Sequence, residues 1–332
     1  MRKNKTLLLK LLVIMAIFTS SCTEKPLQCE LVIDAKAQVG EGALWDTPTQ
    51  RLYWIDIAGK MLHVYAPLER KMDSYPMPAE IGTVVVIDSA NVLLVLAHGL
   101  YNFNLETKEL TEKLRPEIDI ERVRFNDGKC SPQGELWVGT MDIECKNPIA
   151  ALYKVTEYKA TTEIDKGNFE ITEILPNIHV SNGLCWSPDG FTFYYIDSPT
   201  YSIMRYVYNE KTKTISRGER LVETPKEWGT PDGCTIDERG MIWVAHWGGG
   251  KVSCWNPYTR KLMTTIEVPS PNVTSVAFGG ENLDELYITT ARNWMPEGAE
   301  EKFPHAGGLF VAKLGVKGVE SFRFRVVEGG RD

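Results

Sequence analysis

Four oxygen-bearing side chains recur at one position of a repeated sequence pattern. Glu41, Asp127, Asn182 and Asp232 each stand directly before a glycine that leads into an apolar run. If these positions converge, the carboxylates would destabilise the fold unless a positive ion lay between them. All-oxygen ligation favours a hard cation such as Ca²⁺, Mg²⁺ or Mn²⁺. The alternative is that the pairs are only turn residues, for which Asp, Asn and Gly are favoured.

A long repeat is what would bring these residues together. The runs begin at positions 42, 82, 128, 183, 233 and 276, so five intervals of roughly 40 to 55 residues separate them. The intervening segments, such as Leu52–Ile57, are rich in β-branched and aromatic residues and are bounded by turn signals. Six such units predict an all-β, six-bladed β-propeller, in which the innermost strands begin near the central axis. We expect Cys29–Ile33 to complete the last blade beside Phe322–Val327.

Composition excludes several functional classes. The chain has 332 residues, a formal net charge of −7 and a pI near 5.5, and it has no basic stripe of the kind that binds nucleic acid. It contains no G-x-S-x-G nucleophile elbow, which disfavours a serine hydrolase. The five histidines lack the HExxH spacing of a zinc protease; only His246, beside a Gly-rich loop, is a candidate for the pocket.

The N-terminus has the layout of an export signal. Positive residues precede the apolar run Leu11–Phe18, and Cys22 follows two serines. The run is shorter than the ~20 residues that span a bilayer. The segment resembles the lipobox of bacterial lipoproteins, although Thr19 departs from it, and an ordinary cleaved signal is the alternative. We therefore expect a signal peptide over 1–22 with lipidated Cys22 and one propeller domain over 23–332. We expect the protein in the bacterial cell envelope, either in the periplasm or as an outer-membrane lipoprotein. The lipid anchor would be its only contact with the membrane.

Several segments also carry a family resemblance. Gly40–Asp46, Arg124–Lys129, Ser181–Gly183, Pro231–Gly233 and Gly307–Phe310 resemble signature segments of the regucalcin (senescence marker protein) and gluconolactonase family. The likeness extends from about residue 30 to the C-terminus, in the family's order. It implies a six-bladed propeller that hydrolyses lactones of aldonic acids such as gluconolactone.

The resemblance also implies roles for individual residues. It implies a Ca²⁺ or Zn²⁺ ion with a substrate pocket beside it. We favour Ca²⁺, and Zn²⁺, Mg²⁺ and Mn²⁺ are the alternatives. The metal ligands would be Glu41, Asn182 and Asp232, and the pocket would be lined by Arg124, Asn126 and Glu144 with Asp127 close by.

A mechanism and its alternatives follow from these roles. The cation would act as a Lewis acid and Asp232 as general base. Arg124 could instead only neutralise the acidic cluster, and Glu144 could be solvated on a loop. Two other functions stay open: an esterase or organophosphate hydrolase on the same propeller, and a non-catalytic binding propeller with a structural ion. Oligomeric state and disulfide pairing are left undetermined.

Overall fold

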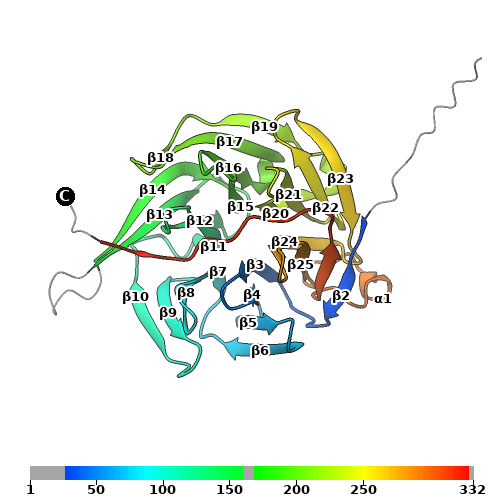
Figure 1. Cartoon of the computed structure of the whole chain (residues 1–332), viewed down its shortest axis with the longest axis horizontal. Coiled ribbons are helices and arrows are strands. Elements are labelled where there is room, and N and C mark those ends of the chain that lie inside the picture. Colours follow the sequence, from blue (N-terminus) through cyan, green and yellow to red (C-terminus); the bar gives the residue numbers. More distant parts are fainter. Residues whose placement is uncertain (1–26, 160–167, 329–332) are drawn as a thin grey trace, which may run out of the picture.

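Six antiparallel sheets surround a common axis and form a six-bladed β-propeller (Figure 1). The computed structural model describes residues 27–159 and 168–328. Within these ranges the only α-helix is α1 (Ala299–Lys302), accompanied by the 3₁₀ helices η1 (Ser198–Thr200) and η2 (Lys226–Trp228). The predicted all-β class and blade number are confirmed. The signal peptide and Cys22 lie outside the described residues.

The first three blades each run outward from an innermost strand through consecutive hairpins. Their strands are β3 (Gly40–Asp46), β4 (Arg51–Asp56), β5 (Met61–Ala66) and β6 (Lys71–Pro76); β7 (Ile81–Val86), β8 (Asn91–Leu96), β9 (Gly99–Asn104) and β10 (Leu110–Leu114); and β11 (Val123–Cys130), β12 (Leu136–Asp142), β13 (Ala150–Tyr158) and β14 (Asn168–Ile178).

The last three blades follow the same plan with variations at their outer edges. Their strands are β15 (Ser181–Trp186), β16 (Thr192–Asp197), β17 (Ser202–Asn209), β18 (Thr214–Ile215) and β19 (Glu219–Glu223); β20 (Thr230–Ile236), β21 (Ile242–Trp247), β22 (Lys251–Asn256) and β23 (Lys261–Glu267), with β1 (Leu27–Gln28) added; and β24 (Asn272–Gly279), β25 (Glu285–Ala291) and β26 (Leu309–Lys313), with β2 (Glu30–Ile33) added.

The hydrophobic core lies between adjacent blades. Strands β3, β7, β15 and β24 are buried along their whole length, so consecutive positions such as Val84-Val85-Val86 of β7 are apolar and the strands show no strict alternation of polar and apolar residues. Between the third and fourth blades, the ring of Trp137 packs against those of Trp186 and Phe193, with centroids 5.6 and 5.0 Å apart. The six cysteines within the described residues are all free thiols. None of the helices in these residues is long and apolar enough to cross a membrane.

The N-terminal strands close the ring. Strand β2 pairs with β26 as expected and forms the outer edge of the last blade, while β1 pairs in parallel with β23. The expectation that Phe322–Val327 lies beside β2 is wrong. Because β2 already pairs with that edge, the chain after β26 instead crosses one face of the ring (Figure 1), and β27 (Val326–Val327) pairs in parallel with β13.

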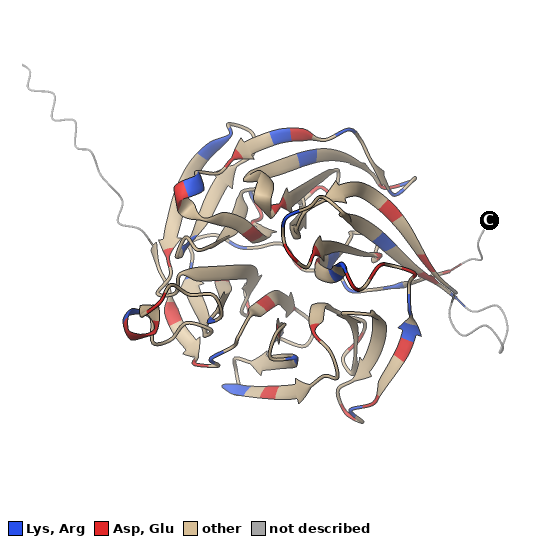
Figure 2. Cartoon of the chain, turned by 180° about the vertical axis from the view of Figure 1, so that it is seen from behind, with Lys and Arg blue, Asp and Glu red and all other residues tan. Residues whose placement is uncertain are grey.

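The crossing segment covers one end of the hub. Gly318 bridges to Asp237, and the guanidinium of Arg323 binds the Asp46 carboxylate through contacts of 2.7 and 2.8 Å. A small cavity of about 50 Å³ lies beneath it, lined by residues that include Lys129 and Cys185. Figure 2 shows the molecule from the other side, where basic and acidic residues are interspersed along the strands and loops. The crossing segment contacts Asp46, Val86 and Asp237 at the far ends of the innermost strands, whereas the candidate ligands lie near the beginnings of these strands.

Candidate metal and substrate site

The candidate ligands lie at a β-bulge that recurs in every innermost strand. The register shifts between Glu41 and Leu44 in β3, between Asn182 and Leu184 in β15, and at the matching points of β7, β11, β20 and β24. A bulge re-aims the side chain at its centre. The glycine that follows allows close approach of the next blade, since a Cβ on Gly183 would lie 2.6 Å from the Asp232 carbonyl oxygen. The alternative that these pairs are only turn residues is therefore wrong.

Three buried carboxyl groups come together at this level of the hub. Glu41, Asp127 and Asp232 are each at most 7% exposed. Burial, together with the charge of Asp127, raises the pKa of Glu41 to about 8. Burial and the charge of Glu41 raise the pKa of Asp232 well above its usual range, and the carboxyl groups of Glu41 and Asp232 are close enough to share a hydrogen bond. Without a positive ion the cluster holds a proton at neutral pH.

The protein compensates this negative charge only in part. Burial also raises the pKa of Asp127. Lys129, which donates to the carbonyl oxygen of Cys234, only lessens the rise in the pKa values of Asp127 and Glu41. Asp232 Oδ1 is buried and has no hydrogen-bond partner in the described part of the chain. A buried carboxylate oxygen without a donor is costly. The donor set is thus one that a hard divalent cation would complete.

No group of three or more His, Cys, Asp and Glu side chains within residues 27–159 and 168–328 is arranged as a metal site by itself. The candidate set combines only two such groups, Glu41 and Asp232, with the carboxamide of Asn182. Asp127 contributes charge, and its Oδ1 accepts the amide hydrogen of Gly128 at 2.8 Å. We therefore assign Asp127 to the electrostatic surroundings of the three candidate ligands.

Asn182 is held by hydrogen bonds at both ends of its carboxamide. Its Oδ1 accepts from Asn126 Nδ2 at 3.0 Å, and its Nδ2 donates to Ser198 Oγ at 2.8 Å. Ser198 Oγ in turn donates to the carbonyl oxygen of Pro231 at 2.7 Å, directly before Asp232. These contacts fix the orientation of the amide, with Oδ1 toward Asn126 and Nδ2 toward Ser198.

Asn126 and Arg124 differ in what they can offer a substrate. Asn126 is buried, and its side chain forms hydrogen bonds with Arg124, Ser181 and Asn182, so it positions the candidate ligand Asn182. The side chain of Arg124 is 21% exposed; its Nη1 donates to Asn126 Oδ1 and its Nε lies 3.8 Å from a carboxylate oxygen of Glu80. Burial lowers the pKa of Arg124 from a very high reference value, so it remains a cation. Arg124 is thus the charged donor at the mouth of the hub.

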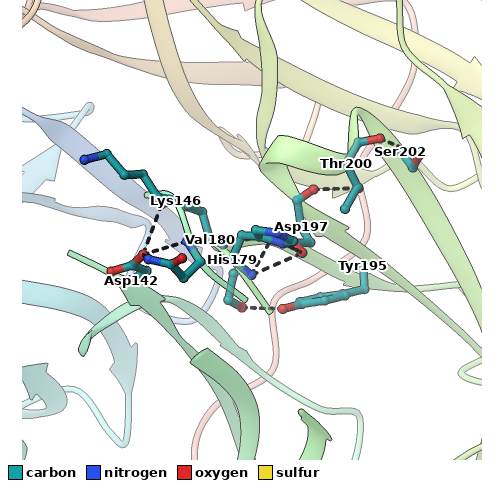
Figure 3. Close-up of polar contacts among 10 residues, drawn as sticks. Asp142, Lys146, His179, Val180, Tyr195, Asp197, Thr200 and Ser202 are labelled. Atoms are coloured by element: carbon teal, nitrogen blue, oxygen red, sulfur yellow. Dashed lines mark hydrogen bonds and ion pairs between the residues drawn. The ribbon is translucent and has the colours of Figure 1, made fainter. Parts of the chain in front are cut away.

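Glu144 lies apart from the other predicted residues. Its side chain is 67% exposed on the loop after β12 and lies 3.2 Å from Lys146 Nζ. Asp142 fixes this loop by accepting backbone amide hydrogens from Glu144, Lys146 and Asn147 (Figure 3 shows Asp142 and Lys146). The described contacts do not join Glu144 to Arg124 or Asn126, and its place as a pocket residue stays a prediction.

Two further carboxylates, absent from the sequence-based prediction, position the ligand-bearing strands. Asp56 accepts the amide hydrogens of Gln38 and Val39 just before β3. Asp197 accepts those of His179 and Val180 just before β15 (Figure 3). Both follow an isoleucine at the end of a second strand, so the repeat alignment contains the signal that could have identified them.

His246 does not serve as a pocket residue. It is fully buried, and its Nε2 lies 2.7 Å from Ser253 Oγ. Burial lowers its pKa to about 4, so the ring is neutral at neutral pH. It packs edge-on against Trp228 with ring centroids 5.8 Å apart. His246 is a core residue of the fifth blade.

Comparison with known proteins decides the family. Residues 39–292 match the family described as the SMP-30/Gluconolactonase/LRE-like region. The chain belongs to this family. The predicted regucalcin and gluconolactonase resemblance is confirmed, and the family assignment agrees with the expected class of enzyme, a hydrolase of lactone ester bonds.

Relatives of this SMP-30/gluconolactonase member cover most of its length. A Bacillus subtilis protein, YvrE, named as a candidate sugar lactone lactonase, is 37% identical over 294 residues, which are 89% of this chain and 97% of that protein. Rabbit (Oryctolagus cuniculus) regucalcin is 30% identical over 90% of this chain and 98% of its own. The structure of an Agrobacterium tumefaciens regucalcin, described as a calcium-binding protein, is 26% identical with a TM-score of 0.83 over 90% of this chain and 99% of its own.

Proposed function

We propose that this chain hydrolyses the lactone of an aldonic acid, such as gluconolactone, to the free acid with the help of one divalent cation. Glu41, Asn182 and Asp232 would hold the cation, and Ca²⁺ is favoured over Zn²⁺, Mg²⁺ or Mn²⁺. The observation that carries the proposal is the buried carboxyl pair at the hub, in which Asp232 Oδ1 has no hydrogen-bond donor among residues 27–159 and 168–328. The calcium-binding description of the Agrobacterium regucalcin supports the choice of metal. The name of the Bacillus relative supports the choice of substrate.

The proposed mechanism assigns each residue one task. When bound, the cation supplies a Lewis acid for the oxygen on which negative charge develops. The Asp232 carboxylate takes a proton from the attacking water as its oxygen bonds to the carbonyl carbon. When the ring C–O bond breaks, Asp232 returns that proton to the departing alkoxide, so the base is regenerated. A lactone is an activated ester, which makes a modest base sufficient.

The remaining residues orient the substrate and the ligands. Arg124, charged and partly exposed at the mouth, would donate hydrogen bonds to sugar hydroxyl groups. Asn126 and Ser198 would hold the Asn182 carboxamide in place. The C-terminal segment across the other face would limit water access from behind. The uncovered face is then the route for both lactone and acid.

The test measures lactone hydrolysis through the acid that is released at constant pH. Glucono-1,5-lactone is compared with an aryl ester and a phosphotriester, each with chelator and with Ca²⁺, Zn²⁺, Mg²⁺ or Mn²⁺ restored. We expect a cation-dependent rate on the sugar lactone above its spontaneous hydrolysis. Metal-dependent turnover of only the ester or phosphotriester would favour the esterase alternative. Cation binding without turnover of any substrate would favour a binding propeller.

We also propose that the chain is exported and anchored through a lipid on Cys22, on the strength of its N-terminal sequence. Expression in a bacterial host with radiolabelled palmitate, comparing the native sequence with Cys22→Ser, tests this. We expect radiolabelled native protein in the membrane fraction and no label on the Cys22→Ser variant. Equal absence of label in both would show an ordinary cleaved signal.

A further inference from the structure

Two tryptophan rings pack against each other at the ligand-bearing end of the hub. Trp247 ends β21, and its ring centroid lies 6.0 Å from that of Trp294, on the loop after β25. Trp294 is 73% exposed, and Trp247 is partly buried. An exposed aromatic ring that packs on a second ring offers a flat apolar surface to a ligand.

Backbone contacts tie both rings to the strands that carry the candidate ligands. Trp247 pairs with Thr230, two residues before Asp232. Two hydrogen bonds of Asn293 hold the loop that contains Trp294. The backbone amide of Asn293 donates to the carbonyl oxygen of Gln38 at 2.9 Å, three residues before Glu41. The backbone carbonyl of Asn293 accepts from Asn272 Nδ2 at 2.9 Å. The aromatic pair therefore lies beside the mouth, between the strands of Asp232 and Glu41.

We propose that Trp247 and Trp294 form a subsite for a second sugar ring, so that the substrate class is the lactone of a glycosylated aldonic acid. This inference rests on the proposed lactonase function. The C–H face of a pyranose packs on an aromatic ring while its hydroxyl groups bond polar neighbours. Arg292 and Asn293, which are half-buried and directly precede Trp294 in its loop, are the candidates for such bonds, and polar neighbours suit a sugar better than an alkyl chain.

The experiment compares cellobiono-1,5-lactone, which carries a second glucose, with glucono-1,5-lactone. For the wild-type protein we expect a higher kcat/KM on the two-ring lactone. Trp294→Ala should lower that value about fivefold to tenfold, the range of one aromatic contact, and leave the value for gluconolactone unchanged. Trp294→Phe should keep part of the preference. Tyr258→Ala is the matched control, because Tyr258 is 72% exposed but lies at the opposite end of the fifth blade, after β22.

A second readout separates this subsite from the lactonase proposal. Cellobionate, the open acid, should quench tryptophan fluorescence in the wild-type protein and much less in Trp294→Ala. Quenching that depends on Trp294, without turnover of either lactone, would refute the lactonase function and support the sugar subsite. If the wild type hydrolyses both lactones and Trp294→Ala lowers kcat/KM equally for the two, or for neither, the subsite is refuted. A preference for alkyl-substituted lactones that Trp294→Ala removes would refute the assignment to a sugar.

Discussion

Replacing Asp232 by asparagine should change stability in opposite directions with and without a cation. Asp232 is buried beside Glu41 and Asp127, and its Oδ1 has no hydrogen-bond partner in the described residues. Without a cation, Asp232→Asn removes one of the crowded carboxyl groups, so the variant should be more stable than the wild type. With a cation, the wild type gains a ligand contact that the variant lacks, so the order should reverse.

The expected size of each effect follows from the burial of the group. Replacing the ionisable carboxyl by a neutral amide that can donate to Glu41 should stabilise the metal-free variant by about 1–3 kcal/mol. Cation at 100 times its dissociation constant should stabilise the wild type by about 2.7 kcal/mol. For a chain of this length that corresponds to a rise in Tm of roughly 5 °C. The cation should produce almost no rise in the variant.

Thermal unfolding followed by circular dichroism, with chelator and with Ca²⁺, measures both effects. Asp127→Asn is the control, because it removes a charge from the same cluster without removing a proposed ligand. It should stabilise the metal-free protein and keep a Ca²⁺-dependent rise in Tm. The reasoning is refuted if Asp232→Asn is destabilised in chelator, or if it keeps the full Ca²⁺ response of the wild type.

Three other predictions concern neighbouring parts of the structure. Burial lowers the pKa of His63 to about 4, so between about pH 6.5 and 4 the unfolded chain binds a proton that the folded chain does not. The free energy of unfolding should therefore fall by up to about 3 kcal/mol as the pH drops through this window. Urea titrations should show a smaller loss for His63→Gln than for the wild type. Arg124→Gln should raise KM for gluconolactone about tenfold through loss of a charged donor and leave Ca²⁺ affinity, measured by calorimetry, nearly unchanged. Ser198→Ala should weaken Ca²⁺ binding about tenfold, because Asn182 Nδ2 loses the acceptor that orients the ligand.

The repeat made the ring and the proximity of Glu41 to Asp232 predictable. Because Glu41, Asn182 and Asp232 occupy one phase of the repeat, a closed ring of blades must bring their strands to one axis. The buried Glu41–Asp232 pair follows from that symmetry. The path of Phe322–Val327 did not follow, since its contacts with Asp46 and Val86 join residues distant in sequence and obey no repeat.

Details of the site depended on side-chain orientation, which the repeat does not encode. Asn126 was predicted at the pocket, but its carboxamide is used by Arg124 and Asn182. The supporting role of Asp197 was encoded in the strand ending Tyr195-Ile196-Asp197, which has the same phase as Ile55-Asp56. Trp294 could not be placed, because its position depends on the loop held by Asn293.

Calorimetric titration of chelator-treated protein with Ca²⁺ tests most directly whether Glu41, Asn182 and Asp232 form one cation site. In two buffers of different ionisation enthalpy, we expect one ion per chain and release of a proton, because the raised pKa values of Glu41 and Asp232 keep a proton on the pair until the ion binds. Asp232→Asn should abolish this heat. A wild type that binds no divalent ion, or a variant with unchanged stoichiometry and affinity, would contradict the proposed site.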